Sequence, residues 1–131
     1  MAPIEVVRGS QLKPGESTRG IVRERAFEDG DVVVSRSRVG PRVASGWHHH
    51  GARHLYGFLV SGRLRLEHGP GGAEGVGIRR GDFFRISPGL VHRDVNPHER
   101  QKAVVVNILV GRGEAVVNVP SPEGRPRPKP S

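Results

Sequence analysis

The chain has 131 residues, of which 34% are hydrophobic and 26% charged, and its formal net charge is +8. This length fits one domain with a modest hydrophobic core. Because there is no cysteine, neither disulfides nor thiolate metal ligands are available. No stretch approaches the ~20 apolar residues of a membrane-spanning helix, and the first residues lack the apolar core of a secretory signal. We therefore expect a cytoplasmic protein with no membrane association.

The positive charge raises the question of nucleic-acid binding. However, the arginines are scattered along the chain and do not gather in one helix or loop, and aromatic residues do not alternate with them. This distribution favours a solvated basic surface, or a small anionic ligand, over a nucleic-acid partner.

Glycine and proline interrupt the chain often, with 19 and 11 residues, which favours short strands over long helices. Taken in chain order, the sequence predicts strands at residues 17–28, 31–39, 54–61, 63–68, 75–80, 82–87, 91–95, 103–110 and 114–119. Asp29-Gly30 predicts the turn of a hairpin, Ser61-Gly62 predicts a turn between two strands, and a long glycine-rich turn follows at 69–72.

In two of these strands, the pattern of residue types predicts which faces are buried. In 63–68, Leu64 and Leu66 alternate with charged residues, which predicts one buried face and one solvated face. Residues 103–110 are almost continuously apolar, as expected for a strand that is covered on both sides. Together the strands predict an all-β domain over residues 1–119, either a double-sheet jelly roll or a closed barrel.

Residues 120–131 alternate proline with basic residues and cannot form a ladder of hydrogen bonds. They predict a flexible basic tail. It is either a simple disordered end or an electrostatic tether to an acidic partner.

Four of the seven histidines lie in residues 47–54, WHHHGARH. On a strand, His48 and His50 point to the same side and His49 to the other, so the first two can reach one metal ion. Three adjacent histidines can also be ordinary surface residues. His92 lies in a second segment, residues 81–96, where a strand, a turn at Ser87-Pro88-Gly89 and another strand return a side chain to the barrel interior.

These two segments resemble the two motifs of the cupin family. The second motif has a glycine, five residues, a proline, one residue, a glycine, two residues, a histidine, three residues and an asparagine. Gly81, Gly89, His92 and Asn96 match it in register, although the proline is displaced from position 87 to Pro88. His48 and His50 match the H-x-H of the first motif, and Gly62 matches its closing glycine. The resemblance covers about residues 40–96 and implies a small single-domain cupin.

The chain departs from the first motif at its glutamate. Counting back from Gly62 places this position at Leu55, which cannot bind metal, and counting on from His50 places it at His54, which can. We therefore expect His54 to be a fourth ligand; the alternative is that His54 only lines the pocket. With neutral imidazoles alone, the metal's charge would favour an anionic or oxygen-chelating small molecule in the open positions.

The metal that the resemblance implies is a divalent transition metal, namely Zn, Fe, Ni, Cu or Mn. Tyr56, Arg53 and Asn96 are candidate polar residues beside it, although Asn96 can equally cap a turn. Phe83 and Phe84 are adjacent on a strand, so one of them, which we take to be Phe84, lines the cavity. The resemblance leaves two functions open: a dioxygenase- or isomerase-like metalloenzyme, or a non-catalytic module that binds or senses a small ligand. It also implies a homodimer, with an edge strand supplied by residues 103–119 or 3–8.

Overall fold

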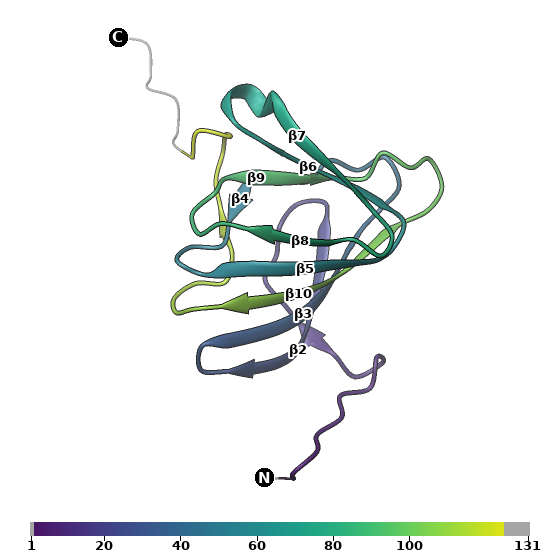
Figure 1. Cartoon of the computed structure of the whole chain (residues 1–131), viewed down its shortest axis with the longest axis vertical. Coiled ribbons are helices and arrows are strands. Elements are labelled where there is room, and N and C mark those ends of the chain that lie inside the picture. The colour runs from purple at the N-terminus through teal and green to yellow at the C-terminus, as the bar shows by residue number, and fades with distance from the viewer. Residues whose placement is uncertain (1, 125–131) are drawn as a thin grey trace.

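The computed structural model describes residues 2–124, which form two antiparallel β-sheets (Figure 1). In spatial order, the six-stranded sheet contains β1 (Lys13–Pro14), β2 (Ile21–Asp29), β3 (Val32–Val39), β10 (Ala103–Val110), β5 (His54–Ser61) and β8 (Phe83–Ile86). The five-stranded sheet contains β11 (Val117–Asn118), β4 (His48–His49), β9 (His92–Val95), β6 (Arg63–His68) and β7 (Glu74–Arg79). A 3-10 turn, η1 (Pro70–Gly72), lies between β6 and β7. The described residues contain no helix long and apolar enough to cross a membrane.

The all-β prediction is confirmed, and the alternation of residue types explains how the two sheets pack. On β6, Leu64 and Leu66 are buried and Arg63 is exposed on the opposite face of the strand, as the period of two predicts. The core lies between the sheets, because both contribute to it. Its buried hydrophobic members are Ile21, Val33, Val39, Leu55, Leu59, Leu64, Leu66, Ile78, Ile86, Ala103, Val105 and Leu109.

Glycine is required at the turn that separates β5 from β6. Gly62 has φ +83°, a conformation that L side chains rarely adopt, and a Cβ there would lie 2.4 Å from the carbonyl oxygen of Lys102. The β2–β3 hairpin has the two-residue loop Gly30-Asp31, one residue later than the predicted Asp29-Gly30, because Asp29 still pairs with Val32; Gly30 has a positive φ of 52°. These turns fix the register that sends alternate side chains of each strand into the interior.

The strand at 103–110 differs from its prediction. Strand β10 pairs with β3 on one side and β5 on the other, so it is central in its sheet and is not an edge. Only alternate residues are buried, whereas Ile108 and Val110 are 40% and 37% exposed on the outer face. The continuous apolar run thus reflects a central strand with one face uncovered in the single chain.

The ends of the domain also differ in detail. The strand predicted at 114–119 is limited to β11, and residues 3–8 are not in a strand. Of the predicted tail, residues 120–124 form a turn in which the Gly124 N–H donates to the Ser121 carbonyl oxygen. Residues 125–131 lie outside the described residues.

Candidate metal centre

Three histidines converge inside the barrel on the five-stranded sheet. His48 on β4 is the cross-strand partner of His92 on β9, and His50 follows directly after β4 on the same face as His48. All three are buried, with exposed fractions of 1%, 4% and 2% for His48, His50 and His92. One ring nitrogen from each lies within 4.8 Å of the others. The strand register therefore brings together two sequence segments that are more than forty positions apart.

Each ring is oriented by a hydrogen bond to the backbone. The Nδ1 atoms of His48, His50 and His92 lie 2.9 Å from the carbonyl oxygens of Gly46, Ala115 and Leu90, in that order. A carbonyl oxygen only accepts hydrogen bonds, so each Nδ1 carries the proton and donates it. In a neutral imidazole, Nε2 is then left with a free lone pair, which is how metal-binding histidines are usually held.

Burial keeps these rings neutral. Desolvation, together with the neighbouring histidines and Arg23, lowers the pKa of His48 to about 2. Desolvation and the two other rings lower the pKa of His50 to about 3. The pKa of His92 is lowered as well, mainly by desolvation, although Asp94 opposes the shift. At neutral pH the cluster therefore presents unprotonated nitrogens, the form that binds a metal.

The cluster lines a cavity whose opposite wall is apolar. Leu55, Phe84 and Ile86 from the six-stranded sheet face it, and Val33, Leu66 and Leu109 add to the apolar lining. Ser35, Ser37 and Asn107 supply hydroxyl and amide groups on the same side. A small molecule in this cavity would contact the histidines on one side and an apolar wall with a few polar groups on the other.

Arg23 on β2 is a charged lining residue that the sequence analysis did not single out. Its Nη1 donates hydrogen bonds to Thr18 Oγ1 at 2.6 Å and to the Glu16 carbonyl oxygen at 3.4 Å. Desolvation lowers its pKa, and the carboxylates of Asp94 and Glu16 oppose that shift. An arginine remains charged in spite of such a shift, so the cavity has a fixed positive charge.

Asp94 is the second residue that the sequence analysis missed, and it corrects the expectation of a site without a carboxylate. It lies on β9 two positions after His92 and also lines the cavity. Its Oδ1 is 3.6 Å from His48 Nε2 and 3.8 Å from His92 Nε2. The period of two along a strand was the available signal, because it places residues 92 and 94 on the same face.

His54 does not join the cluster, contrary to the expectation that it supplies a fourth ligand. It opens β5 with an exposed side chain, whereas the next residue, Leu55, is buried and lines the cavity. Tyr56 follows on the outer face and is 44% exposed. The alternation along β5 thus turns positions 54 and 56 away from the interior and leaves an apolar residue where the cupin motif has its glutamate.

Two other predicted neighbours of the metal are structural instead. Arg53 is buried, but it is not among the residues that line the cavity, and its Nε donates to the Gly113 carbonyl oxygen at 3.0 Å. Asn96 is fully buried; its Nδ2 donates to the carbonyl oxygens of Val39 and Gln101, and its Oδ1 accepts from the His98 N–H. Asn96 therefore has the turn-capping role that was the alternative.

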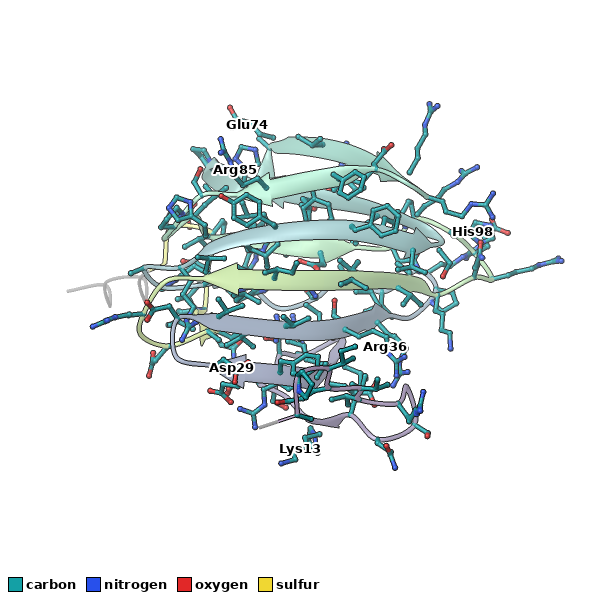
Figure 2. All side chains as sticks on the ribbon, turned by 60° about the horizontal axis from the view of Figure 1, so that its bottom comes forward. Lys13, Asp29, Arg36, Glu74, Arg85 and His98 are labelled. Carbon is teal, nitrogen blue, oxygen red and sulfur yellow. The ribbon has the colours of Figure 1, made fainter. Side chains whose placement is uncertain are left out.

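The remaining aromatic and histidine side chains divide between the cavity and the surface. Phe84 lines the cavity, while Phe83 is 81% exposed and packs on Phe58. His49 points away from the cluster and its Nδ1 accepts a hydrogen bond from the Gly51 N–H. His98 lies in the loop between β9 and β10, at the opposite end of the barrel from Asp29 in the β2–β3 hairpin (Figure 2).

This architecture, with a histidine cluster between two antiparallel sheets, is the double-stranded β-helix fold of the cupins, as the sequence resemblance predicted. A conserved protein of Klebsiella pneumoniae with a double-stranded β-helix domain is similar over 90% of this chain and 97% of its own, with 19% identity and a TM-score of 0.69. An RmlC-like cupin from Shewanella frigidimarina is similar over 81% of this chain and 89% of its own, with 15% identity and a TM-score of 0.63.

Larger enzymes contain the same fold. A deletion mutant of Bacillus subtilis oxalate decarboxylase is similar over 86% of this chain, with 19% identity and a TM-score of 0.69, but this chain spans only 31% of its length. At the level of sequence, no family model matches the chain and no curated protein matches it. The likeness is therefore one of fold, and the residues in the cavity must carry the argument about function.

Proposed function

We propose that this protein is a small metal-binding cupin that holds one divalent transition metal with His48, His50 and His92. The observation that carries the proposal is the orientation of the three rings. Backbone carbonyls fix the proton on every Nδ1, which leaves each Nε2 lone pair free, and one ring nitrogen of each histidine lies within 4.8 Å of the others. A cation at that point satisfies all three, whereas uncompensated buried acceptors cost free energy. The donor set fits Zn, Fe, Ni, Cu or Mn.

We further propose that the site binds a small anionic or oxygen-chelating molecule. Arg23 and the metal would both attract negative charge, and Leu55 and Phe84 form part of an apolar wall for the rest of the ligand. When bound, a divalent metal supplies Lewis-acid polarisation of oxygen ligands. The chain's own residues orient the ligand: Arg23 by its charge, and Ser35 and Asn107 by hydrogen bonding from the opposite wall.

Whether turnover follows binding is a separate part of the proposal. The resemblance implies dioxygenase- or isomerase-like chemistry, and the alternative remains a module that binds or senses its ligand without reaction. The same cavity serves either function, because a cupin barrel hosts unrelated activities. A homodimer, a cytoplasmic location and the lack of a nucleic-acid partner also stay predictions.

The metal site is tested by titration of metal-free protein with Zn²⁺ in competition with a chromophoric chelator. We expect one equivalent to bind to the wild type. His92→Ala should weaken binding by at least about 100-fold, because it removes a ligand and not merely a residue that orients one. His54→Ala is the matched control and should bind as the wild type does, since His54 is exposed on the outer face.

The fold of each variant is checked by thermal unfolding in the presence of EDTA, where no metal contributes to stability. A folded His92→Ala protein that still binds one equivalent with wild-type affinity would refute the proposed site. Equal losses in His92→Ala and His54→Ala would refute it as well, because the site would then have to include the outer face of β5.

A further inference from the structure

We propose that Asp94 supplies a fourth protein ligand to the metal, from β9 in the five-stranded sheet. This inference rests on the proposed metal site and extends it to a residue that lies outside both H-x-H and the position of the motif glutamate. Asp94 follows His92 by two positions on the same strand, so its side chain leaves the sheet on the same face as the ring of His92.

Asp94 lies near two of the three histidines, at distances that approach those between ligands of one ion. With metal–ligand bonds of about 2.1 Å, neighbouring ligand atoms stand about 3.0–3.4 Å apart, depending on coordination number. Asp94 Oδ1 lies 3.6 Å from His48 Nε2 and 3.8 Å from His92 Nε2. Both distances are too long for a hydrogen bond, and closure around an ion would shorten them by about 0.2–0.8 Å.

The arrangement places acceptors against one another. Both Nε2 atoms carry lone pairs, because the protons of these rings are held at Nδ1 by backbone carbonyls. Asp94 Oδ1 is also an acceptor, and it is buried without a hydrogen-bond partner among the described residues. A buried acceptor without a hydrogen-bond partner is costly. A metal ion between these atoms removes the conflict for the carboxylate and the imidazoles together.

The same inference explains how the chain tolerates the loss of the motif glutamate. The two positions that could replace it hold Leu55, which is part of the apolar wall, and His54, which faces outward. A carboxylate from β9 restores a negative charge to the metal site from the other sheet. All four proposed ligands then come from the five-stranded sheet or its immediate continuation, and the six-stranded sheet supplies the opposite wall of the cavity.

The test compares Asp94→Asn with Asp31→Asn. Asp31 is exposed and pairs with Arg112 on the surface, so its substitution removes the same charge without touching the cavity. Each metal-free protein is titrated with Zn²⁺ and with Co²⁺, and the visible spectrum of the Co²⁺ form is recorded. We expect Asp94→Asn to weaken binding of both ions by at least about 10-fold and to change the Co²⁺ spectrum, because the ligand set changes. Asp31→Asn should match the wild type in both measurements.

Unfolding in EDTA separates a ligand from a residue that merely supports the fold. Because the buried Oδ1 of Asp94 has no hydrogen-bond partner among the described residues, Asp94→Asn breaks no hydrogen bond there, and the metal-free variant should be about as stable as the metal-free wild type. Wild-type affinity and an unchanged Co²⁺ spectrum in Asp94→Asn would overturn the inference, and so would a loss of stability in EDTA that matches the loss of affinity. Failure of the wild type itself to bind either ion would instead overturn the proposed metal site.

Discussion

Gly57→Ala tests how tightly the apolar wall of the cavity is packed. Gly57 on β5 is the cross-strand partner of Phe84 on β8, and both face the interior. A Cβ at position 57 would lie 2.2, 2.5 and 2.6 Å from three atoms of the Phe84 ring. Since ordinary carbon contacts begin near 3.5 Å, the ring would have to move by about 1.3 Å or more.

The expected loss in the free energy of unfolding follows from this displacement of the ring. Overpacking of a well-packed interior costs about 1–3 kcal/mol. The lower chain entropy of alanine in the unfolded state returns about 0.4–1 kcal/mol. With mid-range values of about 2 and about 0.7 kcal/mol, the free energy of unfolding should fall by about 1.3 kcal/mol, which corresponds to a decrease in Tm of roughly 5 °C for a domain of this size. Urea unfolding of the metal-free protein measures it directly.

Gly77→Ala on β7 is the matched control. A Cβ at Gly77 meets nothing within 4 Å, and its φ lies outside the left-handed region. This variant should be as stable as the wild type or slightly more stable. In a Phe84→Ala background, Gly57→Ala should lose its cost, since the ring that opposes the new methyl group is gone. Equal effects of the two glycine substitutions, or an undiminished cost without the ring, would refute the reasoning.

Two further predictions concern charge in the cavity. The pKa values of His48 and His50 fall from 6.5 in the unfolded chain to about 2 and about 3 in the fold. The unfolded chain therefore binds more protons below pH 6.5. Above pH 6.5 the free energy of unfolding of the metal-free protein should not depend on these two groups. At lower pH it should decrease by about 1.4 kcal/mol per pH unit for each histidine. A free energy of unfolding that stays constant in urea unfolding between about pH 7 and 5 would contradict this. Arg23→Gln should weaken binding of acetate or oxalate to the Co²⁺-loaded protein by about 10-fold, measured by the visible spectrum, because it removes a charged donor; the exposed control Arg63→Gln should have no effect, and equal losses would contradict a role for Arg23.

The fold could be predicted from the sequence because the local periodicity and the turn residues agree with it. Leu64 and Leu66 alternate with charged residues, and Asp29-Gly30 marks the β2–β3 turn to within one residue, so these strands follow from short-range rules. His48 and His50 on one face follow from the same period of two. These predictions need no knowledge of distant contacts.

The site residues that were predicted wrongly lie beyond the reach of that periodicity. The count from His50 to His54 crosses a turn in which Gly51 has φ +59°, so the alternation of faces does not continue from β4 into β5. His54 therefore turned outward, although its spacing suited a ligand. Arg23 was missed because β2 lies in the other sheet, and only the packing of the two sheets brings it to the cavity. A single sequence does not specify that long-range pairing.

The hydrogen bond from His50 Nδ1 to the carbonyl oxygen of Ala115 has a practical consequence for anyone who shortens this chain. Residues 117–118 also form the strand that pairs with His48 and His49. A chain that ends after Val110 would keep every histidine but would lose the Ala115 carbonyl oxygen, which orients the ring of His50. Truncated forms for expression or crystallisation should therefore extend at least through Asn118, and fusion partners belong beyond that residue.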